Sequence, residues 1–313
     1  MRALVTGGAG FIGSHLVDVL AARGDRVLVL DDMSSGRREN LAGAFDAGAE
    51  LLEGSVTDEA AIAEAFERGR PELVFHLAAH IDVRRSVSDP AFDLDVNAGA
   101  TIKLLERARV AGVARFVFAS TGGAIYGEGE GRDLPLPEDS DCRPDAPYGQ
   151  SKYAAEGYLG LYRRLHGLET IALRLGNVYG PRQDPHGEAG VVAIFCNALR
   201  EDRLPRVFGD GEQTRDYVYA ADVVGAFLTA AERGGGAGPY NIGTGIETSV
   251  IDLGRRIAAA FDREFEFEPA PARLGEIQRI SIDPSLAGRE LGWAASQDLD
   301  RGLAITADWF RGG

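Results

Sequence analysis

The sequence is poor in lysine and cysteine. Lysine and arginine together number 33, yet Lys103 and Lys152 are the only lysines among the 313 residues. The two cysteines, Cys142 and Cys196, do not stand in the C-x-x-C spacing that is typical of metal-binding and redox sites. We therefore expect no metal site and a reducing compartment, and we predict that the protein is cytoplasmic.

Positive charge and long apolar runs are also scarce. The formal net charge is -15 and the sequence pI is about 4.8. A field of that sign repels nucleic acid and anionic membranes, so we expect neither as a partner. No apolar run approaches the roughly 20 residues of a membrane span, and a first strand beginning at Arg2 leaves no room for a signal peptide. Any anionic ligand must therefore be bound by local arginines.

The first 30 residues have the pattern of a strand, a glycine-rich turn, an amphipathic helix and a second strand. Gly7, Gly10 and Gly13 follow the first strand with the spacing G-x-x-G-x-x-G. Such glycines permit a tight turn, a close approach of the backbone to a pyrophosphate, and close packing of the helix on the strand. The phosphates would lie at the N-terminus of the helix, beside Phe11 and Ile12. The pattern predicts a dinucleotide-binding βαβ unit.

Two acidic residues, Asp31 and Asp32, come at the end of the second predicted strand. An acid at this point accepts hydrogen bonds from the adenosine ribose and repels a 2′-phosphate. The pair therefore favours NAD over NADP, although Arg37 and Arg38 just downstream weaken that preference.

Strands and helices continue to alternate through the first half of the chain. The strands expected near 50–53, 73–76 and 115–119 are apolar without an in/out alternation, which is typical of a parallel sheet with helices on both faces. We predict an α/β fold with a Rossmann-type doubly wound parallel sheet over residues 1–176, joined by 216–242. A smaller mixed α/β substrate-binding lobe would occupy 177–313, mainly 177–215 and 243–313. Its predicted elements are helices at 191–200 and 250–261 and strands at 206–208 and 264–267.

Tyr148 and Lys152 stand four residues apart at the start of another predicted helix, so that one side chain lies a turn above the other. A fixed ammonium beside a phenol favours the phenolate, and we expect the pKa of Tyr148 to fall from about 10 toward neutrality. A phenolate at neutral pH can act as a general base. The alternative is an amphipathic helix with an ordinary tyrosine and lysine.

Several motifs in the chain resemble those of the extended short-chain dehydrogenase/reductase family, most of all its nucleotide-sugar 4-epimerases. The resemblance runs over nearly the whole chain and rests on TGGAGFIG, HLAA, STGGAIYG, YGQSK, NVYGPRQ, TRDYVY and NIGTG. It implies an enzyme that uses NAD to interconvert UDP-glucose and UDP-galactose through a transient 4-keto sugar. It also implies a homodimer that pairs helices at roughly 91–111 and 148–166.

The resemblance further implies catalytic roles. Tyr148 would be the base, Lys152 would steady it and hold the nicotinamide ribose, and Thr121 would supply a hydroxyl between the tyrosine and the sugar. The loop that carries Thr121 is one residue longer than in some epimerases, so Ser120 could take that role instead. The same loop has Gly122 and Gly123 where related dehydratases carry an Asp-Glu pair, which disfavours dehydration.

The cofactor contacts implied by the resemblance lie after the third and fourth strands. Asn97 would orient the loop that carries the catalytic hydroxyl, and Ser55 stands where the family usually has an aspartate for the adenine. The other positions are Val56, Leu77, Ala78 and Ala79.

The substrate contacts lie mostly in the second half of the chain. The forked guanidinium groups of Arg215 and Arg273 suit the diphosphate, with Arg182 as a weaker candidate and Asn177 donating from its amide. Ile280 stands where a bulky tyrosine restricts some epimerases to unmodified hexoses. Epimerisation of UDP-N-acetylhexosamines or UDP-uronic acids therefore remains open, as does a catalytically inactive NAD sensor of the same fold.

Overall fold

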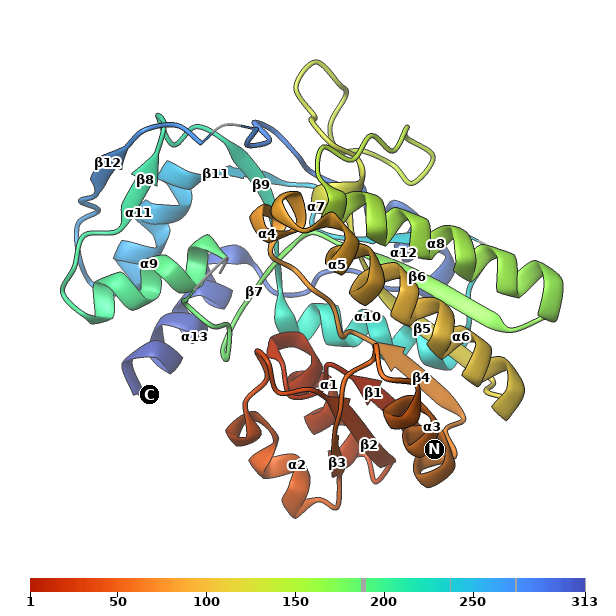
Figure 1. Ribbon diagram of the computed structural model, residues 1–313. Coiled ribbons are helices and arrows are strands. Elements are labelled where there is room, and N and C mark those ends of the chain that lie inside the picture. Colours follow the sequence, from red (N-terminus) through yellow and green to blue (C-terminus); the bar gives the residue numbers. More distant parts are fainter. Residues whose placement is uncertain (187–189, 237, 274, 313) are drawn as a thin grey trace.

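The computed structural model describes residues 1–186, 190–236, 238–273 and 275–312 (Figure 1). A seven-stranded sheet has the order β10-β6-β5-β4-β1-β2-β3, and every pairing in it is parallel. Two smaller sheets, β11-β9-β7 and β12-β8, lie outside it. The predicted Rossmann-type doubly wound α/β fold is therefore confirmed.

The elements have the following bounds. The strands are β1 (Arg2–Thr6), β2 (Arg26–Asp31), β3 (Glu50–Glu53), β4 (Leu73–His76), β5 (Arg115–Thr121), β6 (Glu169–Leu175), β7 (Asn177–Tyr179), β8 (Arg206–Phe208), β9 (Thr214–Tyr219), β10 (Tyr240–Ile242), β11 (Glu247–Ser249) and β12 (Glu268–Ala270). The helices are α1 (Phe11–Ala22), η1 (Arg38–Leu41), α2 (Ala42–Asp46), α3 (Glu59–Gly69), α4 (Val83–Ser88), α5 (Pro90–Leu94), η2 (Asp95–Gly99), α6 (Ala100–Ala111), α7 (Gly122–Ile125), α8 (Pro147–His166), α9 (Val191–Arg200), α10 (Ala220–Arg233), α11 (Val250–Ala260), α12 (Ser285–Leu291) and α13 (Leu299–Gly312).

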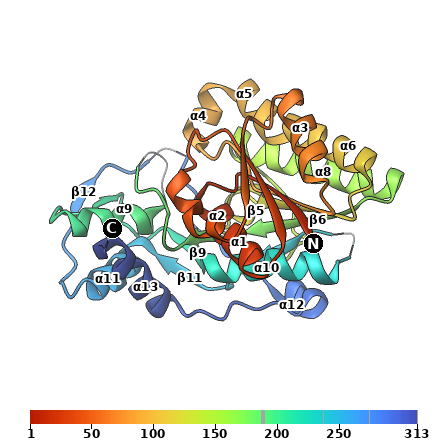
Figure 2. The same cartoon turned by 90° about the horizontal axis from the view of Figure 1, so that it is seen from below.

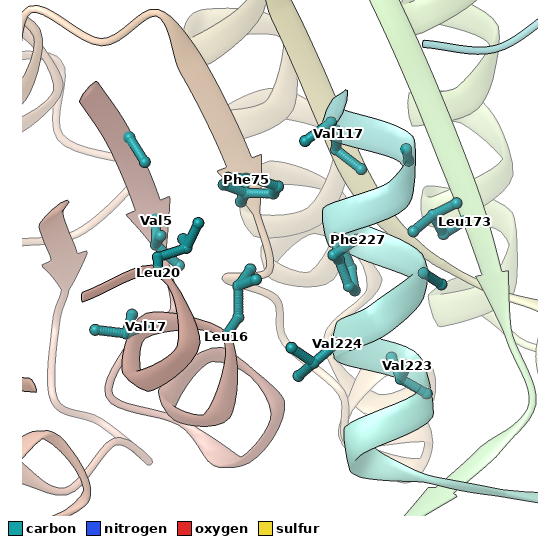
Figure 3. Close-up of a cluster of buried hydrophobic side chains, with 14 of the residues drawn as sticks. Val5, Leu16, Val17, Leu20, Phe75, Val117, Leu173, Val223, Val224 and Phe227 are labelled. Atoms are coloured by element: carbon teal, nitrogen blue, oxygen red, sulfur yellow. The ribbon is translucent and has the colours of Figure 1, made fainter. Parts of the chain in front are cut away.

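Helices cover both faces of the large sheet (Figure 2). The helices α1 and α10 pack on one face, where Leu16 and Phe227 lie against Phe75 of β4 (Figure 3). The helices α3, α6 and α8 pack on the other face through a second cluster that includes Phe66 and Leu104. This two-sided burial explains why the central strands are apolar without alternation.

The strand order reverses at β1, which pairs with β2 on one side and β4 on the other. The loops that leave the carboxyl ends of β1 and β4 therefore diverge to opposite faces and leave a crevice between them. Ligands of doubly wound sheets bind at such a point. The end of β5, with Thr121, lies one strand further along the same edge.

The second half of the chain builds most of the smaller lobe. The helices α9, α11 and α13 share a core with β8 and β9 that includes Phe195, Val207 and Leu253. Because α10 and β10 return to the large sheet, the chain passes between the two parts more than once.

Two of the expected elements differ in detail. The expected strand at 264–267 is wrong, since β12 begins only at Glu268, where it pairs with Arg206 of β8. The rings of Phe265 and Phe267 stack on each other, and Phe265 also faces Phe195. The helix expected at 91–111 begins at Pro90 and contains one π-helical turn, η2.

Asp216 of β9 fastens the smaller sheet to the segments around it. Its buried carboxylate accepts hydrogen bonds from the backbone N–H of Thr244 at 2.8 Å, Gly245 at 3.0 Å and Ile282 at 3.2 Å, and from the Thr244 hydroxyl at 2.6 Å. Four donors thus depend on one side chain.

We expect Asp216→Ala to lower the free energy of unfolding by about 3 kcal/mol or more, because buried donors lose their acceptor. Urea denaturation followed by circular dichroism measures the change. Asp308→Ala, which removes an exposed carboxylate paired with Arg311 on the same helix, is the control and should cost less than about 1 kcal/mol. Equal effects of the two substitutions would contradict the role given to Asp216.

Candidate active site

The glycine-rich turn after β1 has the geometry of a phosphate-binding loop. Gly7 has a φ of 70°, and a Cβ there would lie 2.6 Å from the backbone N of Ala78. A Cβ at Gly13 would lie 2.1 Å from the carbonyl oxygen of Gly7, so this glycine lets α1 start directly on the turn. A Cβ at Gly10 would meet only that carbonyl, at 3.3 Å. The turn therefore leaves open space in front of the first amides of α1, at Phe11 and Ile12, which have no partner within a helix.

The acidic pair divides into a buried and an exposed residue. Asp31 is buried and accepts from the backbone N–H of Ala9 at 2.8 Å and of Met33 at 3.0 Å. Burial raises its pKa. Asp32 is exposed and accepts from the backbone N–H and the hydroxyl of Ser34. Asp31 thus fastens the turn to the end of β2 and brings a carboxylate to the crevice, where a ribose hydroxyl can reach it.

The predicted adenine segment follows β3. Val56 is buried, and the Ser55 hydroxyl lies 2.8 Å from that of Thr57. The second lysine, Lys103 of α6, donates to the Thr57 carbonyl at 2.8 Å and so fixes this loop. On the other side of the crevice, Leu77, Ala78 and Ala79 follow β4 and are half-buried.

These features test whether NAD fits the crevice. The glycine turn provides room and amide donors for a pyrophosphate, and an acid stands at the end of β2 where a 2′-phosphate would be repelled. The residues present therefore fit NAD.

Tyr148, Thr121 and Lys152 come together at the carboxyl end of β5. The Tyr148 hydroxyl is hydrogen-bonded to the side chain of Thr121. Lys152 is only 2% exposed, and its Nζ donates to the carbonyl oxygen of Ala119 at 2.9 Å and lies 4.6 Å from the centre of the Phe118 ring. Helix α8 and strand β5 thus place a phenol, a hydroxyl and an ammonium in one group.

The expected depression of the Tyr148 pKa is wrong for the protein alone. Burial raises the pKa of Tyr148 to about 12, and the hydrogen bond from Thr121 offsets only part of that effect. Burial also lowers the pKa of Lys152 to about 7. The physical reason is that α8 buries both groups, and burial disfavours the charged form of each. A phenolate at Tyr148 therefore needs positive charge beyond that of Lys152.

The two candidate hydroxyls have different partners. The Ser120 hydroxyl donates to Glu156 at 2.6 Å, and Glu156 forms a buried ion pair with Arg174 at 2.7 Å. Thr121 faces Tyr148 instead. The geometry therefore favours Thr121 as the hydroxyl beside the base, with Ser120 behind it.

Asn97 lies in the helical segment after β4, as predicted, but its side chain has another partner than expected. Its amide accepts from the backbone N–H of His80 at 3.0 Å and donates to the His80 carbonyl at 2.9 Å. It thus orients the segment after β4 and not the loop that carries Thr121, which corrects the sequence-based interpretation. Asn97 belongs to the π-helical turn η2.

Asn177 begins β7 beside the catalytic loop. A Cβ at Gly123 would lie 3.4 Å from Asn177 Oδ1 and 4.0 Å from Thr121 Oγ1. The side chains of Asn177 and Thr121 therefore border the same space, which the glycine keeps open.

The predicted diphosphate arginines lie in the smaller lobe. Arg215 donates to the carbonyl of Thr214 at 2.8 Å and lies 3.7 Å from Glu276, while Asp216 faces away from it. The Arg273 guanidinium lies 3.8 Å from the centre of the Phe208 ring.

The other two substrate candidates, Arg182 and Ile280, both have partners within the chain. Arg182 pairs with Asp18 of α1 at 2.7 Å and so fastens the loop after β7 to the Rossmann sheet, and one of its guanidinium nitrogens is buried without a hydrogen-bond partner among the described residues. Ile280 is 2% exposed and packs with Tyr126, Leu136 and Ile282. It fills a small core and does not line the sugar space, so it cannot by itself set the tolerance for acetylated sugars.

Sequence reasoning missed Tyr217 and Glu276. The Tyr217 hydroxyl is buried without a hydrogen-bond partner among the described residues, and the charges of Arg215 and Glu276 act on it. A buried hydroxyl without a partner is costly unless a ligand satisfies it. The available signal was the strand period of two, which places Tyr217 on the same face as Arg215.

The whole chain was compared with known proteins. Residues 3–243 match the model of the NAD dependent epimerase/dehydratase family. The chain belongs to this family. It is 47% identical to the UDP-glucose 4-epimerase of Mycolicibacterium smegmatis over 99% of both chains.

Two solved structures have the same fold over the full chain. The UDP-glucose 4-epimerase of Thermotoga maritima, solved with UDP-glucose, has a TM-score of 0.95 at 44% identity, covering 100% of this chain and 99% of that one. The UDP-glucose 4-epimerase of Thermus thermophilus, solved with NAD, has a TM-score of 0.92 at 42% identity with the same coverage. The family match and both structures confirm the extended short-chain dehydrogenase/reductase resemblance. The family description and the structure solved with NAD confirm the use of NAD.

Two further observations concern the described residues alone. No group of three or more His, Cys, Asp or Glu side chains is gathered there as metal ligands would be. None of the described helices is long and apolar enough to cross a bilayer.

Two substitutions test whether Thr121 or Ser120 supplies the hydroxyl beside Tyr148. We expect Thr121→Val to lower kcat by about 10²-fold, because the hydroxyl beside Tyr148 is lost. Ser120→Ala removes a hydroxyl one residue away and should change kcat by less than about tenfold. Steady-state kinetics compares them, and a larger loss in Ser120→Ala would reverse the assignment.

Proposed function

We propose that this protein is an NAD-dependent epimerase that interconverts UDP-glucose and UDP-galactose through a transient 4-keto sugar. The observation that carries the proposal is the Tyr148–Thr121–Lys152 group, which lies beside the NAD crevice. The relatives named for this activity extend over the full chain at 42–47% identity.

Tyr148 and Thr121 handle the proton of the sugar hydroxyl. Bound NAD supplies the positively charged ring that favours the phenolate of Tyr148, and the acceptor and later donor of the sugar's C4 hydride. Tyr148 takes the proton of the 4-hydroxyl through Thr121 and returns it when the ketone is reduced. Lys152 holds its ammonium at the end of β5, where it would steady the phenolate and hold the nicotinamide ribose.

Inversion requires that the sugar turn while the nucleotide stays in place. We assign binding of the diphosphate to Arg215 and Arg273, whose guanidinium groups lie in the smaller lobe. The Tyr217 hydroxyl lies near Arg215. The sugar space is bordered by Gly123, which has no side chain to hold one face of the ring. Tight binding at the nucleotide and loose contact at the sugar suit epimerisation.

The same glycines argue against dehydration. Eliminating water requires an additional acid and base near the sugar. Gly122 and Gly123 supply neither, and a Cβ at Gly122 would lie 2.7 Å from Ile282 Cδ1, so the structure has little room for a carboxylate there.

The test is to incubate the protein with NAD and either UDP-glucose, UDP-N-acetylglucosamine or UDP-glucuronate, and to resolve the epimers by chromatography. We expect UDP-galactose from UDP-glucose. Tyr148→Phe should lower the rate by about 10³-fold or more while the protein still binds NAD, because it lacks only the hydroxyl. Turnover of another sugar alone would reassign the substrate, and NAD binding without any turnover would indicate a sensor.

We propose further that the protein is a homodimer paired through α5, α6 and α8. These helices pack together on one side of the molecule (Figure 1) and carry large apolar side chains that are exposed, namely Leu94, Val110, Tyr153, Tyr158 and Leu165. Burying such a surface against a second copy would remove it from water. Analytical ultracentrifugation should give twice the mass of one chain, and a monomer at micromolar concentration would contradict the pairing.

We retain two other predictions as proposals. The division into a NAD-binding domain at 1–176, joined by 216–242, and a substrate lobe agrees with the return of α10 and β10 to the large sheet. A cytoplasmic location is supported by the free thiols of Cys142 and Cys196.

A further inference from the structure

Asp93 of α5 is a fully buried carboxylate with no part in the chemistry described above. It accepts hydrogen bonds from the Ser151 hydroxyl at 2.7 Å, the Asn97 amide at 3.0 Å and the His80 ring at 3.1 Å. Ser151 is the neighbour of Lys152 on α8, and His80 belongs to the segment after β4. One carboxylate thus joins the catalytic helix to the wall of the cofactor crevice.

Two of these partners are fixed donors, the Ser151 hydroxyl and the Asn97 side-chain N–H. The Nδ1 atom of His80 donates to Asp93 in the tautomer that carries its proton on Nδ1. A buried carboxylate is costly unless a cation nearby compensates its charge. The charge of Asp93 acts on the ammonium of Lys152, and Ser151, which donates to Asp93, precedes Lys152 on α8.

We propose that Asp93 is a positioning residue for the Tyr148–Lys152 pair, because its buried carboxylate holds α8 against the segment after β4 and supplies the negative charge that keeps the Lys152 ammonium protonated. This role rests on the proposed function, because it concerns how the Tyr148–Lys152 pair of that site is held and charged. Its first test does not depend on turnover.

Titratable groups from several elements act on the ammonium of Lys152. Burial lowers the pKa of Lys152 to about 7, and the carboxylates of Asp93 and Glu156 oppose that effect. Glu156 is already paired with Arg174. His76 of β4 is buried, and both burial and the Lys152 charge lower its pKa, to about 3, so it stays neutral.

The charge of Asp93 raises the pKa of both Lys152 and Tyr148. Without the charge of Asp93, the pKa of Lys152 falls further, and a larger fraction of the ammonium loses its proton at neutral pH. Asp93 also adds to the rise in the Tyr148 pKa, after burial. Neutralising Asp93 therefore moves both titrations to lower pH.

The scarcity of lysine makes the measurement direct. Protein labelled with [ε-¹³C]lysine has two lysine side-chain resonances, and Lys103→Arg assigns them. We expect the Lys152 resonance of Asp93→Asn to titrate about one pH unit or more lower than in the unmodified protein. The Lys103 resonance is the internal control and should not move.

Two variants separate charge from packing. Ser151→Ala removes one hydrogen bond to Asp93 but leaves its charge, and His80→Gln keeps a donor without a titrating ring. Both should leave the Lys152 midpoint unchanged. Asp93→Ser is a second neutral replacement if the amide of Asn, which must face three donors, prevents folding.

An unchanged Lys152 midpoint in folded Asp93→Asn or Asp93→Ser would overturn the proposal, and so would a Lys152 midpoint below about pH 5 in the unmodified protein. If the unmodified protein is active, both limbs of its pH profile of kcat/KM should shift to lower pH in Asp93→Asn. A purely structural role of Asp93 would lower the maximum of kcat/KM without shifting either limb. A shifted midpoint in a protein without turnover would support the role of Asp93 and contradict the proposed function.

Discussion

The hydrogen bond from the Lys152 ammonium to the Ala119 carbonyl joins the catalytic helix to the end of strand β5. Placing an ammonium there requires a compact head group, because the Phe118 ring lies on one side of it and the helix on the other. A planar guanidinium would need more acceptors than one carbonyl offers. This explains why a chain that uses arginine for nearly all its basic residues keeps lysine at this position.

Burial of this ammonium determines the electrostatics around it. A charge taken out of water must be compensated by fixed dipoles or by opposite charge. Here a carbonyl, an aromatic face and the carboxylates of Asp93 and Glu156 share that task. The carboxylates in turn need donors, which Ser151, His80 and Arg174 provide. The polar groups behind the site therefore form one connected set around the Lys152 ammonium.

The sequence predicted those parts of the fold and site that depend on local pattern. The glycine spacing at Gly7, Gly10 and Gly13, and the four-residue step from Tyr148 to Lys152, are local, and both positions agree with the structure. The pKa of Tyr148 was predicted wrongly, because burial by distant elements exceeds the effect of one neighbour. Ile280 was misplaced for a related reason: Leu136, one of its packing partners, is far away in the chain.

The nucleotide end and the catalytic end of the site differ in how their polar groups are satisfied. At the catalytic end, Ser120, Asn97 and Asp93 all have partners within the chain, so the reacting groups are fixed before substrate arrives. At the nucleotide end, the Tyr217 hydroxyl has none among the described residues, and Arg215 is held only by a carbonyl and a distant carboxylate. This difference supports the proposal that binding energy is concentrated on the diphosphate near Arg215 and Tyr217, with the sugar turning beside Gly123.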